Sequence, residues 1–184
     1  MKRHGALNTR MRVLKVARQK EVMTMQILIL YHSKGGNTRK LAEAIADGVR
    51  EEEGVTPVLK GAEEVTKEDF LESEGVIAGS PVYFGVMAAE LKKVFDEFVG
   101  VRKRMEGKIG AAFSTSGDPT GGKETTMMSI IQALLIYGMV IVGDPMSATG
   151  HYGVACAGAP DDKTRLNAAK LGRRVAELAV KLRT

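Results

Sequence analysis

The sequence predicts an α/β protein with a parallel sheet covered by helices on both faces. Beyond a basic N-terminal stretch, short apolar runs alternate with stretches whose apolar residues recur at helical spacing. The run QILILY at residues 26–31 is almost continuously apolar, as expected for a strand buried on both faces. The next stretch, residues 37–53, places Leu41, Ile45 and Val49 on one helical face. Such alternation favours parallel strands joined by crossover helices in a three-layer domain.

Five strands and five helices follow from this alternation. The strands are expected at residues 26–31, 55–60, 75–79, 108–114 and 139–142. The helices are expected at residues 37–53, 66–71, 88–99, 122–137 and 161–182, with Thr66 as the cap of the second. Two strand orders suit such a chain, that of dinucleotide-binding domains and the order 2-1-3-4-5. In both, ligands bind beyond the carboxyl ends of the strands, so we expect the loops after strands one, three and four to carry the site.

The charge of the chain is unevenly distributed. The 184 residues carry a formal net charge of +5, and 44% of them are hydrophobic, which suits one globular domain. Residues 1–24 hold seven basic residues and one acidic residue, so the rest of the chain is close to neutral. We expect residues 1–24 to be a disordered basic extension and residues 25–184 to form the domain. A basic tail can attract nucleic acid or an anionic membrane, but a plain leader is the simpler interpretation, and we expect no nucleic-acid partner.

The cysteine count and the hydropathy pattern indicate where in the cell the protein works and whether it binds a metal. No apolar run approaches the roughly 20 residues that cross a bilayer, and the N-terminus lacks the apolar core of a secretory signal. Cys156 is the only cysteine and is expected to be buried, which leaves no internal disulfide. No cluster of His, Asp or Glu has metal-ligand spacing, so no metal site is expected. Together these features favour a cytoplasmic protein without a membrane span.

The loop after the first strand has the composition of a phosphate-binding site. It comprises Ser33, Lys34, Gly35, Gly36, Asn37 and Thr38. Its hydroxyls can donate to a phosphate, its glycines let the backbone approach, and the N-terminus of a helix supplies N–H groups. Asn37 is expected to cap that helix, and His32 to support the loop by packing or a backbone hydrogen bond. The loop matches neither the Walker pattern nor the Gly-x-Gly-x-x-Gly pattern, and an ordinary glycine-rich turn stays open as the alternative.

The loops after the third and fourth strands suit a flat, partly polar ring. The third strand is followed by Pro81, Val82, Tyr83, Phe84 and Gly85, whose apolar side chains and backbone amides fit the face and the edge of such a ring. The fourth strand leads into Ser114, Thr115, Ser116 and Gly117, which offer donors to a polar ring edge or a ribityl chain. Each loop alone has an ordinary structural alternative. Tyr83 and Phe84 could pack on the neighbouring helix, and the loop after the fourth strand could be a flexible surface loop. Their coincidence with the phosphate loop at one sheet edge strengthens the case for a single ligand.

The motifs in these loops resemble the flavodoxin superfamily, and within it the WrbA-type NAD(P)H:quinone oxidoreductases. The patterns are SKGGNT, GSPVYFGVMAA, STSG followed by GGKET, and YGMVIVG, and the resemblance spans about residues 26–182. It implies the strand order 2-1-3-4-5 and an FMN cofactor. The FMN phosphate is implied at residues 33–38, its ring against residues 82–84 and further contacts at residues 114–117. Tyr137 stands where these enzymes carry a histidine near the flavin, so it is also implied in the site.

The resemblance implies an FMN-dependent oxidoreductase that passes electrons from NADH or NADPH to a quinone-like acceptor. The flavin supplies the redox chemistry, so no side chain need be an essential acid or base. The resemblance also implies a homo-oligomer, a dimer or a tetramer. The alternative is a flavodoxin-type electron carrier that serves a redox protein and has no NAD(P)H reductase activity. The near-neutral domain argues mildly against a carrier, because many flavodoxins are strongly acidic.

Two stretches depart from the WrbA-type pattern. Residues 100–107 are short and basic where the family usually carries an aromatic-bearing loop, and Asp118 and Pro119 are inserted after the fourth strand. Both stretches are expected where the substrate enters. They therefore leave the expected FMN binding intact and put quinone reduction in question. The basic residues 102–104 could attract an NADPH phosphate or an acidic redox partner, but a solvated helix end is the simpler expectation.

Overall fold

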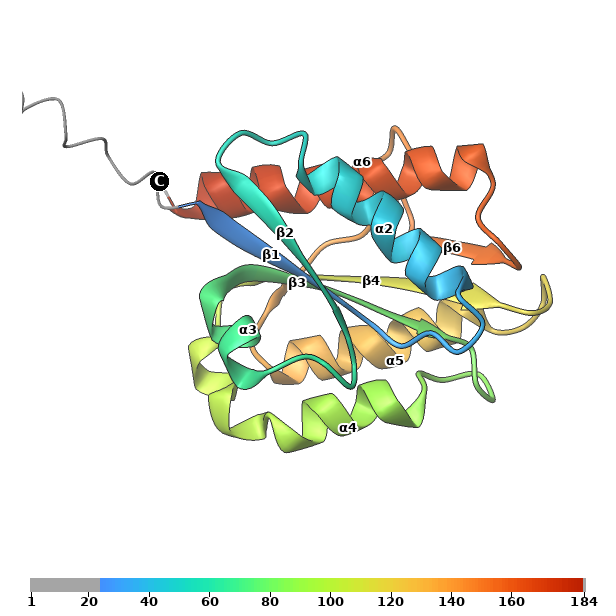
Figure 1. Ribbon diagram of the computed structural model, residues 1–184, viewed down its shortest axis with the longest axis horizontal. Coiled ribbons are helices and arrows are strands. Elements are labelled where there is room, and N and C mark those ends of the chain that lie inside the picture. The colour runs from blue at the N-terminus through green and yellow to red at the C-terminus, as the bar shows by residue number, and fades with distance from the viewer. Residues whose placement is uncertain (1–23, 184) are drawn as a thin grey trace, which may run out of the picture.

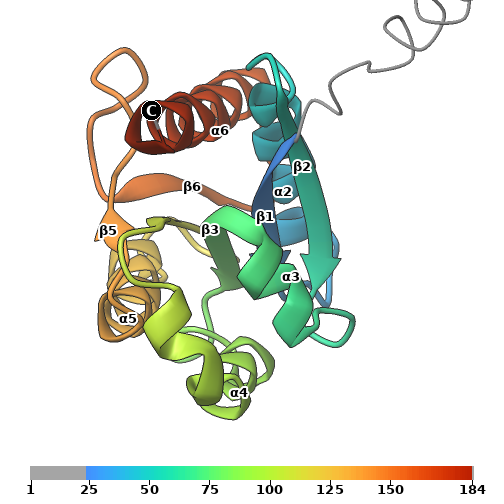
Figure 2. The ribbon, with the colours of Figure 1, turned by 90° about the vertical axis from the view of Figure 1, so that its left-hand side faces the viewer.

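A central parallel sheet and the helices on its two faces make up the protein, which is seen in a computed structural model describing residues 24–183. The strands are β1 (Met25–Tyr31), β2 (Val55–Gly61), β3 (Ser73–Pro81), β4 (Ile109–Ser116), β5 (Val140–Ile141) and β6 (Gly153–Ala157). The helices are α2 (Asn37–Val49), α3 (Lys67–Glu72), α4 (Ala89–Glu97), η1 (Val99–Arg104), α5 (Lys123–Ile136) and α6 (Asp162–Arg183). Helices α2 and α6 cover one face of the sheet, and α3, α4 and α5 cover the other (Figure 1, Figure 2).

The strand order β2-β1-β3-β4-β5 confirms the predicted order 2-1-3-4-5, and every pairing is parallel. Strand β1 lies inside the sheet and separates two cores. Ile27 and Ile29 pack into the core below α2 and α6, whereas Leu28 and Leu30 pack into the core on the other face. All four side chains are fully buried. A strand that faces two cores must be apolar on both faces, which explains the continuous apolar run.

The sixth strand was not predicted. Strand β5 pairs with the first two residues of β4, and β6 pairs with its later part, from Ala112 to Ser116. Because β3 occupies the other edge of β4, the two short strands share the fifth position of the sheet and the segment between them loops out. Cys156 lies in β6 and is buried as expected, and burial raises the pKa of its thiol.

Several helix boundaries differ from the prediction. Helix α2 ends at Val49, four residues early, and the chain reaches β2 through Gly54 at φ +78°. Helix α4 ends at Glu97 and continues as η1, so the basic residues 102–104 form the exposed end of a 3-10 helix. At the start of α3, the expected cap is confirmed. The Thr66 hydroxyl accepts a hydrogen bond from the Asp69 N–H, and the Asp69 carboxylate accepts one from the Thr66 N–H.

Helices α2 and α6 approach each other closely at two glycines. A Cβ added at Gly48 would lie 1.8 Å from the carbonyl oxygen of Ala169, and one at Gly172 would lie 2.1 Å from that of Ile45. Only glycine permits this backbone contact. The contact fixes α2 against α6, and the N-terminus of α2 is part of the candidate site.

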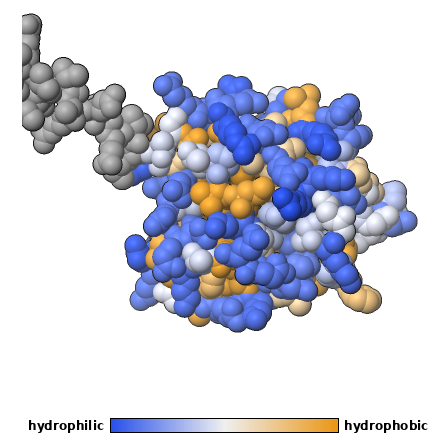
Figure 3. All heavy atoms as spheres, in the orientation of Figure 1, coloured by the Kyte–Doolittle hydropathy of each residue, from blue (hydrophilic) through white to orange (hydrophobic). Residues whose placement is uncertain are grey.

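The surface is mainly hydrophilic on the face seen in Figure 3, with apolar atoms in the middle, where the edge strand β2 runs in Figure 1. Within residues 24–183, no helix combines the length and apolarity needed to cross a membrane. The basic extension predicted for residues 1–24 lies, except for Thr24, outside the described residues.

Candidate functional site

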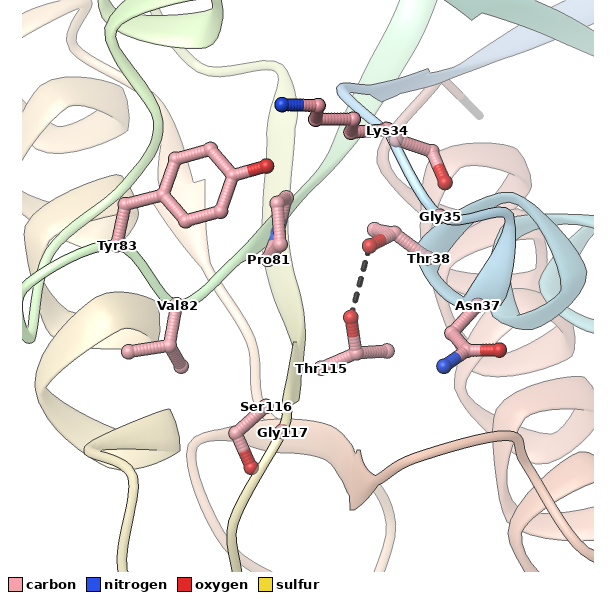
Figure 4. Close-up of a pocket in the computed structure, with 11 residues that line it drawn as sticks. Lys34, Gly35, Asn37, Thr38, Pro81, Val82, Tyr83, Thr115, Ser116 and Gly117 are labelled. Carbon is pink, nitrogen blue, oxygen red and sulfur yellow. Dashed lines mark hydrogen bonds between the residues drawn. The ribbon is translucent and has the colours of Figure 1, made fainter.

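The candidate site is a cleft of about 320 Å³ at the carboxyl ends of β1, β3 and β4. Its walls come from the three loops that the sequence singled out. The lining residues are Ser33, Lys34, Gly35, Asn37, Thr38, Pro81, Val82, Tyr83, Thr115, Ser116 and Gly117. Figure 4 shows their side chains around one opening, with Tyr83 and Val82 on one side and Asn37 and Thr38 on the other. All eleven are residues that the sequence predicted.

The phosphate loop is built around Gly36. It adopts φ +85° as the N-cap of α2, and the Ser33 hydroxyl, just before it, accepts a hydrogen bond from the first-turn Arg39 N–H at 3.2 Å. The expected capping role of Asn37 is therefore wrong, because Asn37 is already the first helical residue and the left-handed N-cap position suits glycine. The N–H groups of the two helical residues before Arg39 remain available to an anion. A Cβ at Gly35 or Gly36 would meet no atom within 4 Å, so the space beside the loop is open.

A hydrogen bond between two threonines forms the floor of the cleft. The Thr38 and Thr115 hydroxyl oxygens lie 2.8 Å apart, and both side chains are buried. Figure 4 shows the pair at the centre of the cleft. The bond joins the start of α2 to the end of β4, and thus ties the phosphate loop to the loop after the fourth strand.

The loop after β3 forms a tight hairpin that turns one aromatic inward and one outward. Tyr83 and Val86 exchange two backbone hydrogen bonds, and Phe84 and Gly85 between them have φ of +51° and +81°. Two central residues with positive φ are the pattern of a type I′ turn. The Phe84 side chain projects into solvent, with a relative exposure of 107%, and neither Phe84 nor Gly85 lines the cleft. The turn directs both away from the cleft, and their contact with the ligand stays a prediction.

The loop after β4 contributes Ser116 and Gly117 but not Ser114. Ser114 pairs with Ser80 inside the sheet, and its hydroxyl donates to the Ser80 carbonyl at 3.0 Å. It therefore supports the neighbouring strand and does not line the cleft. The inserted Asp118 lies beside the cleft, where its carboxylate accepts two hydrogen bonds from Thr120. These bonds, from the hydroxyl and the backbone N–H, lower the pKa of Asp118 and hold the loop in a defined turn.

Tyr137 lies at the opposite edge of the sheet from the cleft, apart from the other residues that the resemblance implies in the site. Helix α5 starts beside the cleft and runs back, which carries its end to the amino end of β4. There the Tyr137 hydroxyl donates to the Phe95 carbonyl at 2.6 Å, and its ring packs on Phe70 and Phe95. Burial raises the pKa of Tyr137 to about 12. Helix η1, just before β4, occupies the same far edge (Figure 1), so the basic residues 102–104 and the shortened stretch do not border the cleft.

A cluster beside the cleft was missed by sequence reasoning. The backbone N–H of His32 donates to the Gly79 carbonyl at 3.1 Å, and the His32 ring packs edge-on against Tyr83, so its contacts are with β3 and the hairpin after it. Its two ring nitrogens, however, each face a carboxylate, Glu63 and Glu90. These glutamates come from distant segments, and no local pattern in the sequence signals their meeting.

The comparison with known families decides the classification. Residues 25–153 match the family described as NADPH-dependent FMN reductase, and this match spans well over half of the chain. The chain belongs to this family. Its motifs and fold place it in the flavodoxin superfamily, on the WrbA-type branch, as predicted.

The relatives of this FMN reductase family member include proteins named flavodoxin and proteins named NAD(P)H dehydrogenase (quinone). A protein of Aquifex aeolicus named flavodoxin is 39% identical over 158 residues, which is 83% of this chain and 85% of that protein. A protein of Archaeoglobus fulgidus named NAD(P)H dehydrogenase (quinone) is 37% identical over 188 residues, with 85% of this chain and 98% of that protein covered.

Solved structures share the fold of this family member. A flavodoxin from the domain Archaea superposes with a TM-score of 0.72 at 27% identity, covering 85% of this chain and 99% of that one. A WrbA-like flavodoxin of Agrobacterium tumefaciens superposes with a TM-score of 0.73 at 21% identity, covering 85% and 98%.

The cleft of this FMN reductase family member fits the parts of FMN. The N–H groups at the start of α2 and the open space at Gly35 suit a phosphate. The side chains of Val82 and Tyr83 form a wall for a flat ring, and Ser116 supplies a polar group. Lys34 is the only charged side chain among the lining residues, and it favours an anionic ligand. Among residues 24–183, no group of three or more His, Cys, Asp and Glu side chains is arranged to hold a metal ion.

Proposed function

We propose that the protein is an FMN-dependent oxidoreductase that oxidises NADH or NADPH and reduces a quinone-like acceptor. The observation that carries the proposal is the convergence of a helix N-terminus, an apolar wall and hydroxyl groups in one cleft. Membership of the NADPH-dependent FMN reductase family supports it, as does the likeness to relatives named NAD(P)H dehydrogenase (quinone).

The residues of the cleft bind and orient the cofactor. Residues 33–38 hold the phosphate, with N–H groups at the start of α2 and the hydroxyls of Ser33 and Thr38 as donors. Val82 and Tyr83 form the wall for the ring, and Ser116 and Gly117 lie at its polar edge. Bound FMN supplies the transfer of a hydride between nicotinamide and acceptor. The lining residues include no Asp, Glu or His, so the chain acts by positioning and by donating hydrogen bonds.

Substrates reach the ring past Tyr83 and the loop that contains Asp118. Tyr83 is 38% exposed, and Asp118 follows directly on Gly117 in the cleft wall. The basic residues 102–104 lie in η1 at the far edge of the sheet, away from the cleft of the same chain. Lys34 is the lining cation available for such a contact.

The test begins with reconstitution and continues with turnover. After incubation with FMN and gel filtration, the protein is expected to carry flavin absorbance, and a Gly36→Val variant is expected to carry much less. The loaded protein is then assayed with NADH or NADPH and a benzoquinone, by the loss of reduced-nicotinamide absorbance. Flavin binding without turnover by either nucleotide would overturn the oxidoreductase proposal, and failure to bind FMN would overturn the assignment of the cleft.

A second candidate function is electron transfer without reductase activity. It is favoured by the relative named flavodoxin at 39% identity. A carrier does not oxidise NAD(P)H itself, but accepts electrons from an added flavoprotein reductase and passes them to a redox protein. If the bound flavin is reduced only when the flavoprotein reductase is added, whether NADH or NADPH is supplied, the carrier is favoured.

We also propose self-association and a cytoplasmic location. The apolar side chains of Phe84, Val86, Leu135 and Ile136 are at least half exposed, along α5 and the neighbouring hairpin. A second copy of the chain could cover them, which favours a homo-oligomer. Light scattering after gel filtration measures the mass, and an Ile136→Glu variant is expected to dissociate. The single cysteine favours a cytoplasmic location.

A further inference from the structure

A second cleft lies between α6 and the segment that joins β5 to β6. Figure 2 shows this segment beside α6, on the opposite side of the helix from α2. The cleft has a volume of about 480 Å³ and shares no lining residue with the candidate FMN cleft. Its lining includes the cations Lys170, Arg173, Arg174 and Lys181 and a single carboxylate, that of Glu177. We call it the cationic groove.

Two of these cations are held in place by backbone carbonyls of the segment opposite. The Lys170 Nζ donates to the Ser147 carbonyl at 2.6 Å. The Arg174 Nη1 donates to the Gly143 and Asp144 carbonyls at 3.2 and 3.0 Å. These bonds fix the positions of the two positive charges, but a carbonyl is a dipole and brings no negative charge to balance them. Within residues 24–183, neither cation forms an ion pair with a carboxylate.

The carboxylates that belong to the groove and its loop are engaged by other donors. Glu177 accepts a hydrogen bond from the Arg173 Nε at 2.8 Å. The Asp144 carboxylate is buried and accepts four hydrogen bonds from residues 149–151 of its own loop. An ammonium has three N–H groups and a guanidinium has five. The bonds to the loop therefore leave donors for an anion on both Lys170 and Arg174.

The arrangement of these donors suits a phosphate ester. Lys170 and Arg174 are four residues apart on α6, so their side chains leave the helix side by side. A guanidinium presents a planar fork of N–H groups that matches phosphate oxygens, and an ammonium adds a point charge. A phosphate monoester carries about two negative charges near neutral pH, and two cations balance them. Pro145 and Leu178 also line the groove and offer apolar surface to the organic part of such a ligand.

We propose that the cationic groove binds a small organic phosphate through Lys170 and Arg174, at a site separate from the candidate FMN cleft. The phosphate oxygens accept hydrogen bonds from the two cations, and the organic part packs on Pro145 and Leu178. The loop that forms one wall leads into β6, which pairs with Thr115 and Ser116. The inference goes beyond the proposed oxidoreductase activity and does not depend on it.

The test measures the binding of phenyl phosphate to the full chain by isothermal titration calorimetry. The buffer has low ionic strength, because salt screens such contacts, and contains excess FMN to occupy the other cleft. We expect saturable binding of phenyl phosphate, weaker binding of inorganic phosphate, which lacks the apolar contact, and no binding of phenol, which lacks the charge. Absence of saturable binding would overturn the proposal. Equal affinities for phenyl phosphate and inorganic phosphate would overturn the assignment to an organic phosphate.

Variants locate the binding in the groove. Arg174→Gln is expected to weaken phenyl phosphate binding about tenfold, because it removes hydrogen bonds to a charged group. This change also removes the bonds to the loop, so Ser147→Glu provides a second variant. Ser147 is exposed, and its hydroxyl makes no hydrogen bond among the described residues, so the change removes no contact. The added carboxylate competes for the same cations and is expected to lower the affinity at least as much.

The matched control is Lys163→Gln, which removes an exposed cation of α6 that does not line the groove. Its affinity for phenyl phosphate is expected to equal that of wild type. Unchanged affinity in Arg174→Gln and Ser147→Glu, or an equal loss in Lys163→Gln, would overturn the proposal. If wild type binds no FMN, the proposed function fails, whereas the groove is still judged by these three variants.

A soluble metabolite and a lipid headgroup can both supply such a phosphate, and sedimentation with vesicles of phosphatidylcholine and phosphatidic acid distinguishes them. We expect the protein to stay in the supernatant, because Lys170 and Arg174 are partly buried beside the loop and face away from a flat surface. Sedimentation that is lost in Arg174→Gln, without binding of phenyl phosphate, would assign the groove to lipid and overturn the soluble ligand.

Discussion

The Thr38 and Thr115 hydroxyls share a hydrogen bond of 2.8 Å although 77 positions separate them in the chain. Two hydroxyls bring two hydrogens, and the bond between them uses one. The hydrogen of the accepting hydroxyl stays free, and both side chains line the cleft. The pair can therefore stabilise the fold and donate to a ligand at the same time.

This arrangement predicts coupled losses in Thr38→Val and Thr115→Val. Each variant removes the shared bond, so each is expected to lower the free energy of unfolding by about 1 kcal/mol and to weaken FMN binding about tenfold, through lost donation to a charged group. In the double variant the stability losses are expected not to add, because one bond is lost in all three proteins. Urea denaturation and fluorescence titration measure the two effects. Thr56→Val, on the exposed side of β2, is the control, and additive losses would contradict the coupling.

Tyr137→Phe tests whether the end of α5 belongs to the flavin site. The change removes the bond to the Phe95 carbonyl, and we expect a loss of about 1 kcal/mol in unfolding free energy. FMN affinity is expected to be unchanged, since Tyr137 lies at the far edge of the sheet. Weaker FMN binding in this variant, without a larger loss of stability, would contradict the placement.

The same residue predicts a response to alkaline pH. Burial raises the pKa of Tyr137 from 10.0 to about 12, so ionisation is disfavoured in the folded state. The stability contributed by the neutral phenol is complete below pH 10 and is lost as the pH rises toward 12. Urea denaturation at pH 9 and pH 11 is expected to show a smaller decline in Tyr137→Phe than in wild type. Tyr152→Phe, at a half-exposed side chain, is expected to behave as wild type.

The location of the site could be predicted because topology fixes which loops meet. Parallel strands bring their carboxyl ends to one edge, so loop composition alone identified the residues around Thr38, Val82 and Ser116. The split fifth strand could not be predicted in the same way. The β6 segment GVACA is short and weakly apolar, and its pairing with β4 depends on a loop organised by Asp144.

The errors within the site have a common cause in backbone geometry. Phe84 turns outward because its φ is +51°, and Ser114 does not line the cleft because its hydroxyl donates to the Ser80 carbonyl of β3. Composition does not encode either orientation. The position of Tyr137 was assigned by resemblance, although the reversed direction of α5 after β4 already places the end of that helix at the far edge. The partners of His32 lie on separate elements, and only the folded chain brings them together.

Asp144→Asn is expected to destabilise the loop between β5 and β6. The buried carboxylate accepts hydrogen bonds from the Thr149 N–H and hydroxyl and from the N–H groups of Gly150 and His151. An amide offers one acceptor oxygen to these donors, so we expect a loss of about 2–3 kcal/mol at pH 7.

The acid dependence of this variant follows from the same bonds. Burial alone would raise the pKa of Asp144, but the hydrogen bonds outweigh burial and lower it below 3.8. Its stabilisation is therefore present at neutral pH and is lost as the pH falls through the lowered pKa. In urea denaturation the difference between wild type and Asp144→Asn is expected to shrink as the pH is brought below 4. Asp96→Asn on the exposed face of α4 serves as the control, and a difference that stays constant with pH would contradict the account.

Neighbouring aromatic residues offer the sharpest test of the cleft wall. Tyr83 lines the cleft and Phe84 projects away from it at a backbone angle that favours glycine. Tyr83→Ala is expected to weaken FMN binding about tenfold, since it removes an aromatic contact. Phe84→Gly is expected to leave FMN affinity unchanged and to raise the free energy of unfolding by up to about 1 kcal/mol, because relief of the left-handed strain exceeds the entropic cost of glycine. Fluorescence titration and urea denaturation of both variants measure these effects. Equal losses of FMN affinity in the two variants would mean that the hairpin turns when the ligand binds and that the cleft wall includes Phe84.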